Sequence, residues 1–147
     1  MNARRRRALL KAVTVMLEPG EQIEATSLVN LSEVSVKKNV AMGIAAAVLS
    51  GGTMIAAAAP QPMYLAGSRE RLFLFQANPT FAKPDRHLAT FEIKDVKRTE
   101  IKRGFVKHSF ILIDESAGSA LRIFFPWFGV KDMDAVAGLV PTATATV

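Results

Sequence analysis

The chain has 147 residues, enough for one domain with a sizeable hydrophobic core. Its formal net charge of +6 and its pI of about 10.0 suggest an anionic partner, either a lipid surface or nucleic acid. The chain contains no cysteine, which excludes disulfides, thiolate metal sites and a cysteine nucleophile and is compatible with a cytoplasmic location. Hydrophobic residues make up 50% of the chain, so an unusually apolar segment must be present.

The N-terminus combines four arginines with an apolar helical pattern. The spacing of Leu9, Val13 and Leu17 places them on one face and predicts a short amphipathic helix over residues 8–17, which Pro19-Gly20 ends. The order of basic and apolar residues is that of an export signal, but Lys11 interrupts the apolar part and no cleavage site follows. We therefore expect either a helix packed on the domain or an anchor that attracts anionic lipid.

The first strand is expected within residues 21–36, where apolar and polar residues alternate with one slip near Ser27–Val29 that suggests a bulge.

An uncharged segment then runs from Val40 to Ala59, long enough for a transmembrane helix. It is mostly Ala and Gly, and Ser50–Thr53 interrupts it in the middle. The strands expected before and after this segment would pair in one domain, so both of its ends must lie on the same side of a membrane. A single crossing is then excluded. A hairpin of two apolar arms is therefore expected, packed in the chain or an oligomer, or inserted in a membrane, and a true span is the remaining alternative if those strands do not pair. Its contact residues would be Val40, Met42, Ile44, Val48, Leu49, Met54 and Ile55.

The clearest local pattern lies at residues 63–76. Two apolar runs, Met63–Ala66 and Leu72–Phe75, flank a short polar corner and predict a tight antiparallel hairpin. Further strands are expected within residues 87–103, 107–115 and 120–127, a loop at 77–86, and an amphipathic helix at 129–140. The absence of strand–helix alternation excludes a parallel α/β sheet. The predicted fold is α+β, mainly β. It has about seven strands in an antiparallel sandwich or partly open barrel, capped by the C-terminal helix.

Several short motifs resemble the bacterial PH-like (pleckstrin-homology-like) domain family, which is related to GRAM domains. These are "LEPGEQIEA" at Leu17, "SRERLFLF" at the family's Thr-x-x-Arg-Leu hairpin, and "ATFEIKDVKRTEIKRG" at its Ile-x-x-Val corner. "HSFILIDESAGSALRIFFP" and the last helix complete the resemblance, which covers residues 17–140. The resemblance implies that the Ala/Gly insert at 39–60 lies at the open mouth of the fold, where lipid headgroups bind in eukaryotic relatives. The expected organisation is a basic tail and helix at 1–17, a PH-like domain at 18–140 and a tail at 141–147.

No constellation of catalytic residues stands out. His87 and His108 are the only histidines, and neither has a second ligand at helical spacing. No Gly-x-Ser-x-Gly elbow or phosphate-binding glycine loop occurs. We therefore expect no enzyme activity, no metal and no cofactor.

The basic residues carry the remaining functional signal, although a solvated sheet face would account for many of them. Nucleic-acid binding would require aromatic residues interleaved with cations, and only Phe105 beside Arg103 hints at this. Anionic lipid or headgroup binding is expected from Arg4, Arg5, Arg6, Arg7, Lys37, Lys38, Arg69, Arg71, Lys102 and Arg103. The sequence thus predicts a non-enzymatic binding or assembly module, cytoplasmic and peripheral at the inner face of a bacterial membrane. Its partners would be anionic lipids, a protein, or further copies of itself. The alternative is a soluble homo-oligomeric scaffold in which residues 40–59 form the subunit interface.

Overall fold

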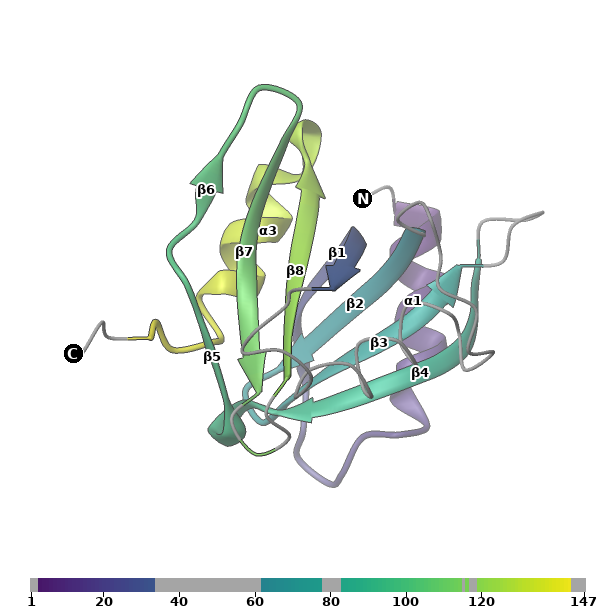
Figure 1. Cartoon of the computed structure of the whole chain (residues 1–147). Helices are drawn as coiled ribbons and strands as arrows, with labels where there is room; N and C mark the ends of the chain where they lie inside the picture. The colour runs from purple at the N-terminus through teal and green to yellow at the C-terminus, as the bar shows by residue number, and fades with distance from the viewer. Residues whose placement is uncertain (1–2, 34–61, 78–82, 115, 117–118, 144–147) are drawn as a thin grey trace.

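A computed structural model describes residues 3–33, 62–77, 83–114, 116 and 119–143 of the chain (Figure 1). Two α-helices flank an antiparallel sheet of eight strands, in the order β4-β3-β2-β1-β8-β7-β5 with β6 paired to β7. The elements are α1 (Ala3–Thr14), β1 (Ile23–Glu33), β2 (Pro62–Ser68), β3 (Arg71–Ala77), β4 (Pro84–Glu92), a 3-10 turn (Ile93–Asp95), β5 (Val96–Arg98), β6 (Lys102–Arg103), β7 (Lys107–Asp114), β8 (Ser119–Pro126), a second 3-10 turn (Trp127–Gly129) and α3 (Val130–Ala137). The sheet is open, because its end strands β4 and β5 do not pair with each other.

The hairpin of β2 and β3 is buried on both of its faces. Met63 and Leu65 belong to the main core, whereas Tyr64 and Ala66, which alternate with them, pack against α1 on the opposite face. The same alternation divides β3, with Leu72 and Leu74 in the main core and Phe73 and Phe75 under α1. Burial on both faces explains why each strand is a continuous apolar run, and the predicted hairpin is confirmed.

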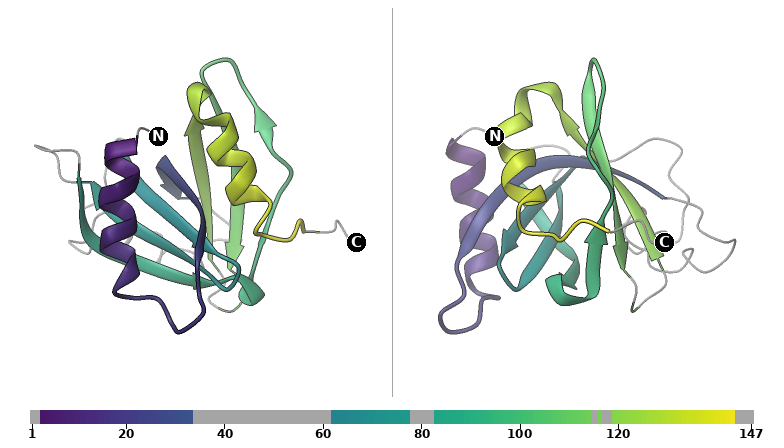
Figure 2. Two further views of the ribbon diagram at one scale, coloured as in Figure 1. Left: turned by 180° about the vertical axis from the view of Figure 1, so that it is seen from behind. Right: turned by 90° about the vertical axis from the view of Figure 1, so that its left-hand side faces the viewer.

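Strand β1 joins the two halves of the sheet. Residues 23–30 of β1 pair with β2, and residues 30–33 pair with β8. The register shifts between Ile23 and Ala25, so the irregularity lies nearer the start of the strand than the bulge expected at Ser27–Val29. Because β1 serves both halves, the sheet is continuous and curves around one core, which is consistent with the predicted sandwich or partly open barrel (Figure 2).

The two helices cover different surfaces of this curved sheet. Helix α3 places Met133 and Val136 in the main core, as the predicted amphipathic pattern requires. Helix α1 packs Leu9 and Val13 on the other face of β2 and β3 (Figure 2). It begins at Ala3 and not near residue 8, so the four arginines lie within the helix.

The structure corrects one detail of the predicted architecture, and one prediction lies outside the residues that it describes. The described residues contain eight strands, where about seven were expected, and β4 begins at Pro84, inside the segment expected to be a loop. The Ile93–Val96 corner is a 3-10 turn between β4 and β5. The insert at 39–60 lies outside the described residues. None of the helices within the described ranges has the length and apolar character needed to cross a bilayer.

Candidate functional site

The turn between β2 and β3 is fastened to the segment that follows α1. The Arg71 guanidinium donates hydrogen bonds to both carboxylate oxygens of Glu21 and to the backbone oxygen of Met16, at 3.0 Å. The Ser68 hydroxyl donates to Glu21 Oε2 at 2.6 Å and accepts the backbone N–H of Arg71 at 2.9 Å. Hydrogen bonds from Arg71, and then from Ser68, lower the pKa of Glu21 from 4.5 to about 2. Glu21 is therefore ionised at neutral pH although its side chain is buried, and it joins the segment after α1 to the β2–β3 turn.

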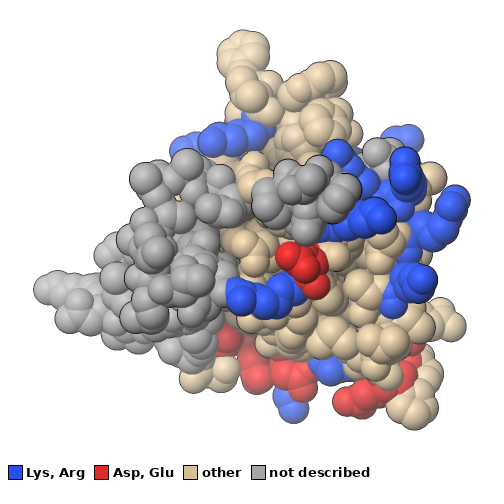
Figure 3. All heavy atoms as spheres, turned by 90° about the vertical axis from the view of Figure 1, so that its right-hand side faces the viewer, with Lys and Arg blue, Asp and Glu red and all other residues tan. Residues whose placement is uncertain are grey.

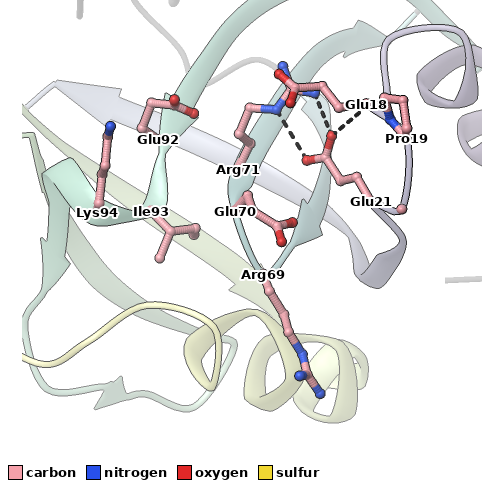
Figure 4. A pocket seen from close by; sticks show the side chains of 10 residues that line it. Glu18, Pro19, Glu21, Arg69, Glu70, Arg71, Glu92, Ile93 and Lys94 are labelled. Atoms are coloured by element: carbon pink, nitrogen blue, oxygen red, sulfur yellow. Dashed lines mark hydrogen bonds and ion pairs between the residues drawn. The ribbon is translucent and has the colours of Figure 1, made fainter.

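A cavity of about 600 Å³ opens beside this ion pair (Figure 4). Four glutamates and three cations line it, together with Pro19, Gly20 and Ile93. Of the cations, Arg71 is bound to Glu21, and Arg69 forms an ion pair with Glu24 at 2.7 Å. We call this region the acidic end, comprising Glu18, Glu21, Glu70, Glu92 and Asp95. An excess of carboxylates disfavours the binding of an anion here.

The cationic side chains expected to bind anionic lipid do not form one surface. Arg69 and Arg71 lie at the acidic end, already paired with glutamates, whereas Lys102 and Arg103 form β6 at the opposite end of the sheet. Arg4, Arg6 and Arg7 are exposed in the first turns of α1, and Arg5 is half-buried. Lys37, Lys38 and the insert residues Val40, Met42, Ile44, Val48, Leu49, Met54 and Ile55 lie outside the described residues.

A second hollow, of about 310 Å³, lies on the outer face of the β6–β7–β8 hairpins. Its lining includes Lys102, Lys107 and Arg122, and the Lys107 ammonium lies 4.2 Å from the centre of the Phe124 ring. The strand register places Lys102 beside Ser109, and Ser109 beside Phe124, so the three cations surround a central hydroxyl and ring. Among the described residues, no carboxylate forms an ion pair with these three cations.

Four large apolar side chains are exposed next to this hollow. Phe105 and Val106 form the turn between β6 and β7 with relative exposures of 103% and 71%, and Trp127 and Phe128 follow β8 with 63% and 61%. The sequence pattern alone indicates only Phe105 of this cluster, because apolar residues at the ends of strands resemble core residues. A signal was present, since both "RGFVK" and "PWFGVK" place apolar residues between a turn residue and a cation.

We call this region the cationic end, comprising Lys102, Arg103, Lys107, Arg122 and the exposed apolar residues. In Figure 3, Lys and Arg side chains gather over the upper half of the molecule, and Asp and Glu lie mainly along its lower edge. The N-terminus of α1 also lies toward the upper end in Figures 1 and 2. On this face the cations therefore lie mainly above the carboxylates, although Arg69, Arg71 and Lys94 also line the acidic end and Arg6 forms an ion pair with Asp132 at 3.7 Å.

The described residues contain no group of three or more His, Asp or Glu side chains that could hold a metal ion. His87 Nε2 lies 2.7 Å from the Thr90 hydroxyl, and its ring packs edge-on against Phe75. The expectations of no metal, no cofactor and no enzyme activity remain predictions.

Comparison with known proteins supports the fold. No family model matches the chain, and no curated protein matches its sequence. A structure of Vav1 inhibited by an allosteric inhibitor is similar, with a TM-score of 0.54 and 12% identity over 93% of this chain and 34% of the Vav1 chain. An apo structure of an activated truncation of Vav1 has a TM-score of 0.50 and 10% identity, over 92% and 32% of the two chains. The chain thus spans about a third of the Vav1 chains that it matches, and this likeness is consistent with a PH-like fold.

Proposed function

We propose that this chain is a non-enzymatic PH-like module of the bacterial, GRAM-related kind that binds an anionic membrane surface at the inner face of the cell membrane. The observation that carries the proposal is the separation of charge. Lys102, Lys107 and Arg122 line the hollow at one end of the sheet, and four glutamates line the cavity at the other. A domain polarised in this way is oriented by an anionic surface, which attracts basic residues by about 1 kcal/mol each.

The arginines of α1 support the same proposal. Helix α1 has no acidic residue in its first turn and carries Arg4, Arg5, Arg6 and Arg7 in its first two turns, where Arg6 forms an ion pair with Asp132 at 3.7 Å. Cations at a helix N-terminus oppose the helix dipole, at a cost of about 0.3–1 kcal/mol each. Unfavourable local interactions of this kind, here between cations and the helix dipole, occur in natural proteins mostly at functional sites. Anionic lipid near these side chains would offset the repulsion, and the apolar insert would add contact area.

Sedimentation with vesicles tests the proposal. The full chain should pellet with phosphatidylglycerol/phosphatidylcholine vesicles, fail to pellet with pure phosphatidylcholine, and be released by salt. Replacing either of the exposed arginines Arg4 and Arg7 by Glu, one at a time, should weaken the binding. The matched control Lys94→Glu, which reverses a charge at the acidic end, should leave it unchanged. Equal binding to both vesicle types, or none to either, would overturn the proposal.

A further inference from the structure

The turn between β6 and β7 is a small, well-defined projection. Figures 1 and 2 show it extending beyond the neighbouring strands. The backbone N–H of Gly104 donates to the Lys107 oxygen at 3.1 Å, which closes the turn. A Cβ atom at Gly104 would lie 2.7 Å from that same oxygen, so the turn needs glycine at this position. Phe105 and Val106 are thus presented at the apex by a fixed backbone.

The segment after β8 is tied to this apex. The Trp127 N–H donates to the Val106 oxygen at 3.1 Å, and the Trp127 and Phe128 rings pack edge to face with centroids 5.7 Å apart. Four exposed apolar side chains therefore form one projecting cluster, which we call the apolar tip (Phe105, Val106, Trp127 and Phe128). Contiguous exposed apolar side chains of this kind mark an interaction site on a monomer.

The charged residues around the apolar tip indicate the kind of partner that it binds. Residues 101–113 and 120–131, which form the tip and its supporting strands, contain Lys102, Arg103, Lys107, Arg122 and Lys131 but neither Asp nor Glu. The hollow of about 310 Å³ lies directly under Phe105 and Val106, with Lys102, Lys107 and Arg122 around it. An apolar projection ringed by cations is complementary to a bilayer whose acyl region lies beneath anionic phosphates.

We propose that the apolar tip enters an anionic bilayer, with a lipid phosphate held in the hollow by Lys102, Lys107 and Arg122. This inference rests on the proposed membrane function and names the part of the surface that performs it. Phe105 and Val106 reach deepest, while Trp127 lies at the headgroup level, where tryptophan is enriched. The projecting apex fits a membrane better than a nucleic acid, because single strands follow a positively charged groove with their bases stacked on rings, whereas Phe105 and Val106 are exposed at the tip of a turn.

The single tryptophan of the chain, Trp127, reports this insertion directly. Its fluorescence should shift to shorter wavelength with phosphatidylglycerol-containing vesicles and should be quenched by lipids brominated on the acyl chain. Phe105→Asp should reduce partitioning by about 10- to 100-fold, since it removes a large apolar side chain from the inserted surface. The control Val15→Asp alters a residue that is 85% exposed just after α1, at the acidic end, and should have no effect.

The proposed phosphate site in the hollow is tested by Lys102→Ala and Arg122→Ala. Each variant should bind phosphatidylglycerol vesicles more weakly, while quenching of Trp127 persists at saturating lipid.

If vesicles bind without a change in Trp127 fluorescence and Phe105→Asp binds normally, the tip proposal fails and the membrane function stands. If no anionic vesicle binds, the membrane function itself fails. If a single-stranded oligonucleotide shifts Trp127 fluorescence and vesicles do not, the tip is a nucleic-acid surface and the proposal is overturned. Phe105 is fully exposed, so the urea midpoint of Phe105→Asp should match the wild type.

Discussion

Glu21 and Arg71 lie 50 positions apart in the chain and form a bidentate ion pair at the acidic end of the domain. The same carboxylate accepts the Ser68 hydroxyl at 2.6 Å and the Glu18 backbone N–H at 3.0 Å. One side chain therefore joins the segment between α1 and β1 to the turn between β2 and β3. The Arg71 guanidinium also lies 4.8 Å from the centre of the Phe73 ring, under α1. This anchor holds α1 on the sheet and gives its arginines a fixed position.

Removing Arg71 should destabilise the domain. Arg71→Ala leaves Glu21, whose side chain is 4% exposed, without its cation. We expect a loss of about 3 kcal/mol in the free energy of unfolding, near the lower limit for breaking a buried ion pair. Urea denaturation followed by circular dichroism measures it. Arg69→Ala is the control, because the Arg69 side chain is 78% exposed and its ion pair with Glu24 contributes little.

The ion pair also predicts a specific dependence of stability on pH. The pKa of Glu21 is lowered from 4.5 to about 2, so its stabilisation is complete above about pH 4.5. It is lost as the pH falls toward 2, because the unfolded chain then takes up the proton more readily. Urea midpoints measured across this interval should fall steeply in the wild type. Glu21→Gln should be less stable at neutral pH and should lack this component; an unchanged slope would contradict the assignment.

Much of the fold follows from local sequence patterns, but the ion pair does not. The β2–β3 hairpin was predictable because Met63–Ala66 and Leu72–Phe75 are buried on both faces and so are apolar at every position. In contrast, nothing local indicates that Glu21 and Arg71 meet, since their contact depends on strand register. That is why Arg71 was expected among the ligand-binding cations. The apolar tip was missed for a related reason, because Trp127 can be recognised as exposed only once the end of β8 is known.

The turn that positions Glu21 is tested by the substitution Gly20→Ala, with stability measured by urea denaturation. Its φ of +85° is left-handed, and it follows Pro19 in a turn closed by the Glu21 N–H to the Glu18 oxygen at 3.0 Å, an arrangement typical of type II turns. A Cβ at Gly20 would meet nothing within 4 Å, so Gly20→Ala costs backbone energy alone, about 1 kcal/mol. Gly129→Ala should change the urea midpoint little, since its φ is −104° and its Cβ would make ordinary contacts.

The packing of α1 can be followed through Tyr64, the only tyrosine of the chain. Burial in the cluster with Leu9 and Val13 raises the pKa of the Tyr64 hydroxyl above 10.0. An absorbance titration should show this delayed ionisation in the wild type. Leu9→Ala should lower stability by about 2–4 kcal/mol and bring the Tyr64 pKa back toward its ordinary value. Val15→Ala, at an exposed position beyond α1, should change neither quantity.

Cell fractionation combined with light scattering tests most directly whether the module works on a membrane. The full chain and a Val40–Ala59 deletion would be expressed in bacteria, and the soluble fraction of each would be sized. The wild type should sediment with membranes and be released by salt, and the deletion should be more soluble and monomeric. A soluble, multimeric wild type that becomes a monomer on deletion would contradict the membrane function and would identify the chain as a homo-oligomeric scaffold.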